Sequence, residues 1–216
     1  MIPYCFAVEY ARRCLDLIEM MEAQARKNEL VGSFALLAAA AVFTVPYERG
    51  KARHFLARDE REAALFAALK NVEKSQKFIA ADFWERKPPG DWRYSRICTD
   101  PIDSRGWMDE QRRHPMDPGA ANTIHRITTG DVLRVVRNAL AHGNIVYLDA
   151  YGRERSGHMV KYLAFLSHYK ETEAEQKEDG TYRLVVTTED DFLNFVRAWA
   201  NWLTTIPLDY RFVEAA

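Results

Sequence analysis

The sequence has little cysteine, almost no net charge and no long hydrophobic run. Only 3 of its 216 residues are cysteines, and none lies in a Cys-x-x-Cys pair. This argues against a disulfide scaffold or a structural zinc site and is typical of thiols in a reducing cytosol. The 30 basic and 31 acidic residues give a net charge of −1, which excludes a uniformly basic nucleic-acid binder but not a local basic patch.

The sequence also lacks signals for membranes, cofactors and metals. The apolar run at 34–45 is shorter than the roughly 20 residues that a membrane span needs. The first residues carry no basic segment of the kind that opens a secretory signal. No glycine-rich phosphate loop occurs, and His114 and His125 are not spaced as metal ligands. We therefore expect a cytoplasmic protein with no membrane association, no cofactor and no metal.

Apolar residues, in contrast, are abundant. Hydrophobic residues make up 48% of the chain and aromatic residues 12%, enough to bury a substantial core. The length favours a single domain over 1–216. Within it, the first segment, about 4–84, predicts three helices, the second of them ended by Pro46. Their apolar stripes are Ala7, Ala11, Cys14, Ile18 and Met21 on the first, nearly all of 28–44 on the second, and Leu65, Leu69, Val72, Ile79 and Phe83 on the third.

The second segment, about 87–122, is rich in proline and has little periodicity, so it is predicted to be an irregular insertion. Trp92, Trp107 and several arginines could make it a loop that contacts a ligand. The alternative is a surface excursion whose arginines pair with its own aspartates and glutamates.

The rest of the chain predicts one helix, a small sheet and a last helix. A helix is expected at about 129–142, with Thr129 as its N-cap and Gly143 just after its end. Short β-rich runs over about 145–187 predict an antiparallel sheet, and 188–206 predicts the last helix. The fold class is therefore mainly α: a helical bundle with an irregular insertion and a small antiparallel β-sheet before the last helix.

The helix at 129–142 carries the most informative polar residues. At about 100° per residue, Arg134, Arg137, Asn138 and His142 fall on one side, and the apolar residues fall on the other. Arginine binds phosphate oxygens through a planar fork, an amide can donate to them, and a histidine can move a proton near neutral pH. These groups would suit a phosphodiester. The alternative is a solvated polar face with a favourable cation near the helix C-terminus.

The run from Arg137 to Asn144, Arg-Asn-Ala-Leu-Ala-His-Gly-Asn, resembles the Arg-x4–6-His signature of HEPN domains, in the variant with asparagine after the arginine. Apolar helices before it and a helix after it are similar to the all-helical HEPN core. The resemblance covers about 4–84, 129–144 and 188–206 as architecture, and only the motif residue by residue.

Many HEPN proteins are metal-independent endoribonucleases that cut RNA in a cleft shared by a homodimer and leave a 2′,3′-cyclic phosphate. They act in toxin–antitoxin systems and phage defence. The resemblance therefore implies RNA, a second copy and an antitoxin protein as partners. It implies that Arg137 stabilises the phosphate, that His142 is the general base or acid, and that Asn138 orients the phosphate or supports His142.

Four further residues are candidate substrate contacts. Arg134 is added from the helix geometry alone, and Asn144 closes the motif. Glu48 and Arg49 follow the second helix, where polar groups can line a HEPN cleft or simply form a solvated turn.

The motif departs from the family's pattern at one position. HEPN toxins paired with a nucleotidyltransferase antitoxin often carry a tyrosine two residues after the histidine, where this chain has Asn144. The alternative to a ribonuclease is a non-catalytic HEPN-like module that binds RNA, a nucleotide or a protein partner.

Overall fold

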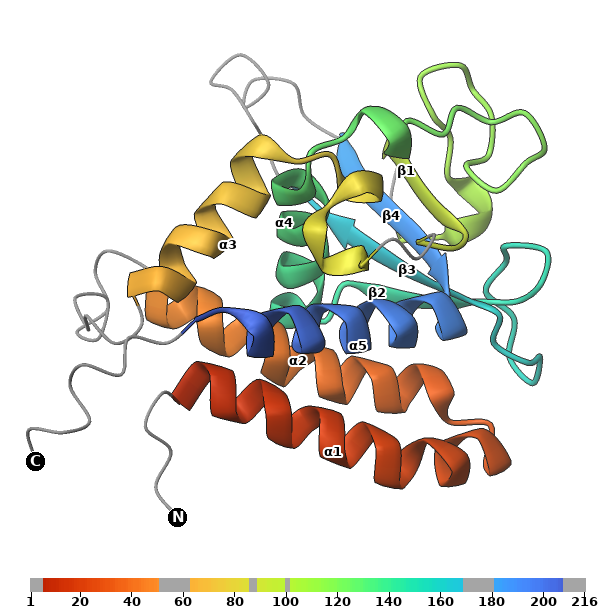
Figure 1. The fold of residues 1–216 in the computed structure, drawn as a ribbon. Coiled ribbons are helices and arrows are strands. Elements are labelled where there is room, and N and C mark those ends of the chain that lie inside the picture. Colours follow the sequence, from red (N-terminus) through yellow and green to blue (C-terminus); the bar gives the residue numbers. More distant parts are fainter. Residues whose placement is uncertain (1–5, 51–62, 86–88, 100–101, 169–180, 208–216) are drawn as a thin grey trace, which may run out of the picture.

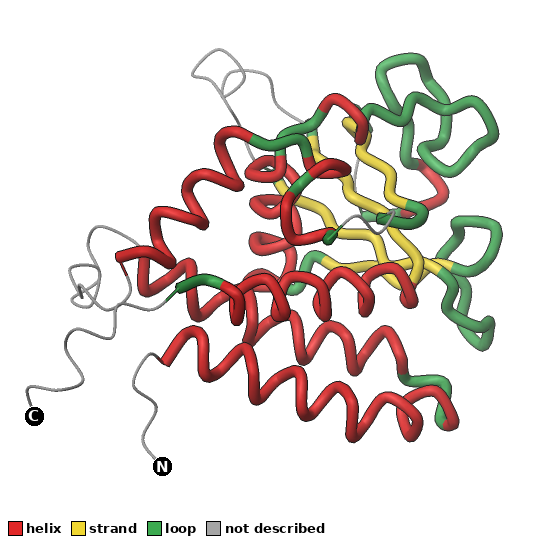
Figure 2. The backbone as a smooth tube through the Cα atoms, viewed as in Figure 1, coloured by secondary structure: helices red, strands yellow, loops and turns green. Residues whose placement is uncertain are grey.

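The computed structural model describes residues 6–50, 63–85, 89–99, 102–168 and 181–207. Three helices pack against one another: α1 (Phe6–Lys27), α2 (Val31–Gly50) and α5 (Glu189–Thr205) (Figure 1). The shorter α3 (Ala63–Ser75) packs on α4 (Thr129–His142), and α4 in turn packs on the sheet. Figure 2 shows these helices on one side of the strands and most of the loops at the far end of the sheet.

Two predictions for the first helices are wrong. Pro46 does not end α2, which continues to Gly50. Proline removes one backbone donor, and a helix held by neighbouring helices can tolerate that loss. On α1 the predicted stripe is buried at Ala11, Cys14 and Ile18, but Met21 is 46% exposed. The side chain of Ala7 lies outside the described part of the chain.

The third helix is also shorter than predicted. It ends at Ser75, and two 3-10 turns follow, at Phe78–Ala80 and Asp82–Trp84. Lys77 forms a β-bridge with Thr128, and the Trp84 indole Nε1 donates to the Phe78 carbonyl at 2.7 Å. The turns bring Phe78, Phe83 and Trp84 into the core together, and burial of these three rings stabilises them. A continuous helix would not place all three on one side.

Four strands form one antiparallel sheet in the order β1-β4-β3-β2. They are β1 (Trp92–Ile97), β2 (Ile145–Leu148), β3 (Tyr162–Ser167) and β4 (Tyr182–Thr188). β2, β3 and all but the last residue of β4 lie in the β-rich range predicted at about 145–187, of which residues 169–180 lie outside the described part of the chain. β1 was missed, because two arginines interrupt its short alternating pattern.

β1 changes the interpretation of the insertion. Trp92 and Trp107 are 2% and 0% exposed, so neither is available to a ligand. Trp92 faces the helices, whereas Trp107 covers the opposite face of the sheet. The insertion's arginines pair locally, Arg96 with Glu110 at 2.9 Å and Arg105 with Asp103 at 2.9 Å. These contacts favour the paired surface excursion over the aromatic ligand loop.

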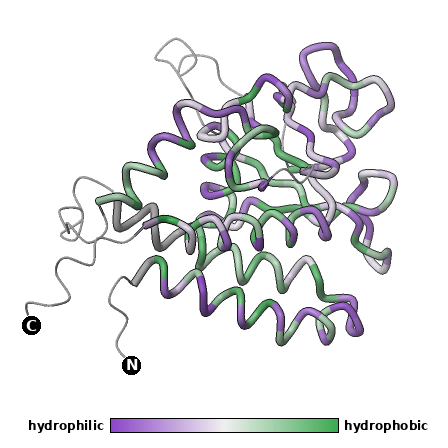
Figure 3. The backbone as a smooth tube through the Cα atoms, viewed as in Figure 1, coloured by the Kyte–Doolittle hydropathy of each residue, from purple (hydrophilic) through white to green (hydrophobic). Residues whose placement is uncertain are grey.

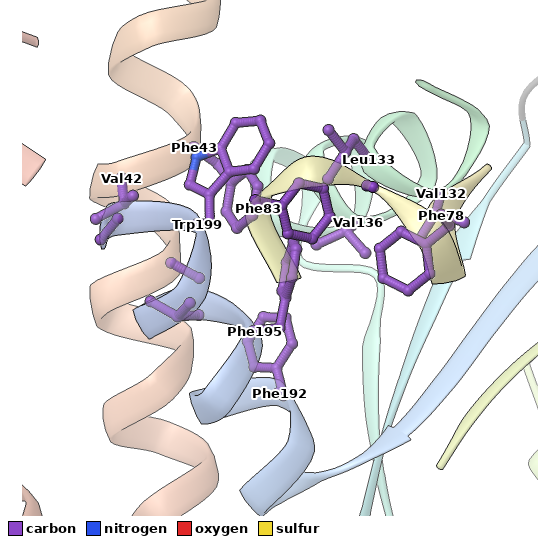
Figure 4. Close-up of a cluster of buried hydrophobic side chains, with 14 of the residues drawn as sticks. Val42, Phe43, Phe78, Phe83, Val132, Leu133, Val136, Phe192, Phe195 and Trp199 are labelled. Carbon is purple, nitrogen blue, oxygen red and sulfur yellow. The ribbon is translucent and has the colours of Figure 1, made fainter. Parts of the chain in front are cut away.

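The main core lies where α5 meets α2, the two 3-10 turns and α4. Figure 4 shows Phe195 of α5 among Phe43, Phe78, Phe83 and Trp199. Ring centroids of Phe195 lie 5.0 Å from those of Phe43 and 5.6 Å from those of Phe83. The last helix, predicted at 188–206, buries one apolar side in this core: Phe192, Phe195, Val196, Trp199 and Leu203 are buried, and Trp202 is half-buried.

A half-buried carboxylate joins α5 to the start of α2. Oε1 of Glu189 accepts a hydrogen bond from the Gly32 N–H at 2.8 Å. Burial raises the pKa of Glu189, although that hydrogen bond and the charges of Lys161 and Arg26 oppose the rise. The folded state therefore binds a proton at this carboxylate more tightly than the unfolded chain does.

We expect Glu189→Gln to flatten part of the pH dependence of stability. Because the folded pKa is raised, the stability that protonation adds in the wild type is present below the ordinary pKa of about 4.3 and is lost as the pH rises through the raised value. The free energy of unfolding of the wild type should therefore increase relative to that of the variant as the pH falls from 7 to about 4. Urea unfolding of both proteins across this pH range measures the difference. Parallel plots of unfolding free energy against pH would contradict the prediction.

Candidate functional site

The predicted bounds of the motif helix, 129–142, are confirmed as those of α4. Its N-cap is Thr128 rather than the predicted Thr129: the Thr128 hydroxyl accepts from the Asp131 N–H at 3.2 Å and donates to the Asp131 carboxylate at 2.6 Å. Thr129 is buried, and its hydroxyl donates to the Gln76 carbonyl instead. At the other end Gly143 has φ of 73°, the left-handed conformation that ends helices and favours glycine.

One side of α4 is fixed in the core. Its apolar residues are buried to 1% exposure or less, and they pack between the helices and the sheet: Val132, Leu133, Val135, Val136 and Ala139. At Gly130 a Cβ atom would lie 2.8 Å from the Glu73 carbonyl oxygen, so α3 and α4 approach closely there. The opposite side is therefore held in one rotational setting.

The candidate site residues occupy that opposite side with different exposure. Arg134, Arg137 and Asn138 are half-buried, whereas His142 and Asn144 are exposed. The Arg134 guanidinium lies 3.8 Å from the Asp131 carboxylate, which the N-cap hydroxyl also holds. No partner for the His142 ring is found among the described residues. The imidazole thus faces solvent at the end of a rigid helix.

Asn138 has an anchor that the sequence did not reveal. Its Nδ2 donates to Oγ of Ser167, the last residue of β3, at 3.1 Å. Ser167 is 3% exposed and lies beside Arg183 of β4 in the sheet register. An asparagine amide carries two donor hydrogens and an acceptor oxygen, so one donor is used by the protein and the others remain. No spacing within the motif points to a serine that far along the chain.

The chain that follows the motif is tied to the sheet through its backbone. Asn144 donates its N–H to the Ala139 carbonyl at 3.0 Å and accepts from the Leu166 N–H at 3.0 Å. Only its side chain is therefore open to a substrate. Glu48 and Arg49 lie within α2 rather than after it, and their side chains lie outside the described part of the chain.

An exposed apolar surface lies beside the motif. On α2 the Leu37 side chain is 74% exposed, one turn after Ser33. The Ser33 hydroxyl lies 3.2 Å from that of Tyr147, which is 38% exposed on β2 just after the motif. Figure 3 shows that the residues of α2 are largely hydrophobic, whereas hydrophobic and hydrophilic residues alternate along α1. The exposed side of α2, the edge strand β2 and the end of α4 are thus neighbours.

The described ranges contain neither a metal-binding cluster nor a membrane-spanning helix. No group of three His, Cys, Asp or Glu side chains is arranged there to hold a metal ion. No helix in the same ranges is both long and apolar enough to cross a membrane. Of the cysteines, Cys14 is buried and Cys98 is exposed.

Comparison with known protein families identifies the family of the chain that carries this motif. A family model described as HEPN pEK499 p136 matches residues 1–209. The chain belongs to this HEPN family. The matched range contains every described helix and strand, so the four-stranded sheet and the insertion lie within the matched part of this HEPN protein. No match is found among curated proteins or solved structures.

Proposed function

We propose that this HEPN protein is a metal-independent endoribonuclease, and that two copies form its cleavage site. The single observation that carries the proposal is the arrangement on α4: a half-buried Arg137, an anchored Asn138 and a solvent-facing His142 on one rigid helix of a HEPN chain. We also propose that the chain is a single domain built on a HEPN helical bundle. Its further partner would be an antitoxin protein, in a toxin–antitoxin or phage-defence setting.

The chemistry needs only groups that the chain and the RNA supply. The ribose 2′-oxygen attacks the adjacent phosphorus, the bond from phosphorus to the 5′-oxygen breaks, and a 2′,3′-cyclic phosphate and a 5′-hydroxyl result. One general base takes the 2′-hydroxyl proton, and one general acid gives a proton to the departing 5′-oxygen. His142 acts in proton transfer, and the Arg137 guanidinium stabilises the extra charge on the phosphorane.

Helix geometry favours a site shared by two copies. Five positions on an α-helix separate Arg137 and His142 by about 140° around the axis and roughly 7.5 Å along it. The two side chains of one copy therefore lie at opposite edges of the polar side of α4, too far apart around the axis to converge on one phosphate. A two-fold axis beside α4 would let Arg137 and the partner's His142 face one phosphate, and the two imidazoles would supply the base and the acid. The exposed Leu37 and Tyr147 next to the motif provide apolar surface for such contact.

We expect the purified wild-type protein to cut single-stranded RNA in the presence of EDTA. The products should carry 2′,3′-cyclic phosphate ends, which acid treatment and phosphatase digestion distinguish from open phosphates. Sedimentation of the same sample should give a dimer. If the protein binds RNA but cleaves none of a broad panel, the ribonuclease proposal is wrong, and the non-catalytic RNA-binding module takes its place.

A further inference from the structure

A cavity lies on the far side of the sheet from the motif helix. It has a volume of about 630 Å³ and lies between the loop at 115–118 and the loop at 150–155. Arg93 of β1 lines it, and so does Tyr162 of β3. Arg93 pairs in register with Val186, whose side chain belongs to the cluster on the face away from the helices. In Figure 1 both loops lie beyond the sheet on the side away from α4.

Contacts within and between the two loops fix the walls of this cavity, which we call the loop cavity. Gly152 has φ of 72°, and a Cβ there would lie 2.5 Å from Cβ of Met116, so the two loops touch. Nη1 of Arg93 donates to the Pro115 carbonyl at 3.4 Å. The buried Asp149 carboxylate accepts from the N–H groups of Tyr151 at 2.8 Å and Arg153 at 3.0 Å. The insertion and the loop between β2 and β3 therefore hold one another in place.

The lining combines arginines with tyrosines. Arg93, Arg153 and Arg155 line the cavity, against the single acid Asp117. Arg93 and Arg155 have carboxylates nearby, but each lies 3.7 Å away, which leaves guanidinium donors for a ligand. The Arg153 guanidinium has no ion-pair partner among the described residues.

The tyrosine at the mouth of the cavity is exposed. Tyr151 is 76% exposed, although its backbone is fixed by Asp149. An exposed aromatic ring beside arginines is the combination that binds single-stranded nucleic acid, because bases stack on the ring and phosphates pair with the guanidinium groups. Figure 3 shows that the surrounding loops are largely hydrophilic, so an apolar protein partner fits this surface poorly.

We propose that the loop cavity binds single-stranded RNA away from the cleavage site, with a base on Tyr151 and phosphates on Arg153 and its neighbours. The choice of RNA rests on the proposed ribonuclease function. Tyr162 begins β3 and Ser167 ends it, so the cavity and the anchor of Asn138 lie roughly 17 Å apart at 3.4 Å per residue. A dinucleotide at the motif cannot reach the cavity, whereas a longer strand can.

The test measures binding separately from cleavage. A labelled 20-nucleotide RNA with 2′-O-methyl groups cannot undergo attack by its 2′-oxygen, so its fluorescence anisotropy reports binding alone. Arg153→Glu and Tyr151→Ala should each weaken binding by about tenfold, and the salt dependence should fall in Arg153→Glu. Tyr151→Phe keeps the ring and should bind as the wild type does. Arg105→Ala, an exposed arginine outside the cavity, is the matched control.

The outcomes separate this proposal from the ribonuclease proposal. Loss of binding in Arg153→Glu and Tyr151→Ala supports the loop cavity even if no RNA is ever cut. Unchanged binding in both, or no binding by the wild type, overturns it even if a dinucleotide is cleaved normally. Equal affinity for adenosine monophosphate and for the 20-nucleotide RNA also overturns it, because the site would then take a free nucleotide rather than a strand.

Discussion

His142→Ala is expected to lower the rate of RNA cleavage by about 10²–10⁴-fold, the usual contribution of a general acid or base. The imidazole is exposed at the end of α4, and no partner for it is found among the described residues, so its removal should leave the fold intact. Arg137→Ala should cost about 10²–10³-fold, because the phosphorane would lose its charge-assisted donors. Single-turnover cleavage of a short RNA in EDTA measures both effects.

Matched variants keep this prediction sharp. His125→Ala removes another exposed histidine just before α4 and should cut RNA at the wild-type rate. Arg137→Lys keeps the charge but loses the planar fork, so its rate should lie between those of the wild type and Arg137→Ala. Wild-type cleavage by His142→Ala, with an unchanged dimer, would remove this histidine from the mechanism.

Phe195→Ala should lower the free energy of unfolding by about 3–5 kcal/mol, the range for deleting a fully buried aromatic ring. Phe195 is 0% exposed. Its ring contacts those of Phe43, Phe78, Phe83, Trp84, Trp92, Phe192 and Trp199. These rings come from α2, both 3-10 turns, β1 and α5, and a cavity at their centre has no flexible neighbour to fill it.

Urea unfolding measures this loss. The control is Met20→Ala, which truncates a side chain that is 74% exposed on α1 and should change stability by less than about 0.5 kcal/mol. A Phe195→Ala variant within 1 kcal/mol of the wild type would mean that α5 does not organise the core.

Local signals explain which elements the sequence predicted well. The helix at 129–142 has a threonine cap, a glycine stop and a clear apolar face, and all three act within the element itself. The end of α3 at Ser75 was mispredicted, because the turns after it are set by contacts with Thr128 and by the packing of Phe78. β1 was missed because two arginines interrupt its short pattern, and because its partner β4, which stabilises it, lies far away in the sequence.

The candidate site shows the same division. Arg137, Asn138 and His142 could be placed on one side of a helix from their spacing alone, and α4 has that helical span. The hydrogen bond from Asn138 to Ser167 could not be predicted, since it depends on how β3 crosses α4. Trp92 and Trp107 looked like candidates for ligand contact in an irregular loop, and only the sheet shows that they are core residues.

The pairing of β1 with β4 has a consequence for synthesis of the chain. β1 is an edge strand, and its register partner begins roughly 85 residues later. At about 5–20 residues per second, the ribosome delivers β4 on the order of ten seconds after β1 has emerged. During that interval Trp92 and Tyr94 lack the strand beside which they are later buried. The nascent chain is therefore most exposed to aggregation, and most in need of a chaperone, just before its last helix is made.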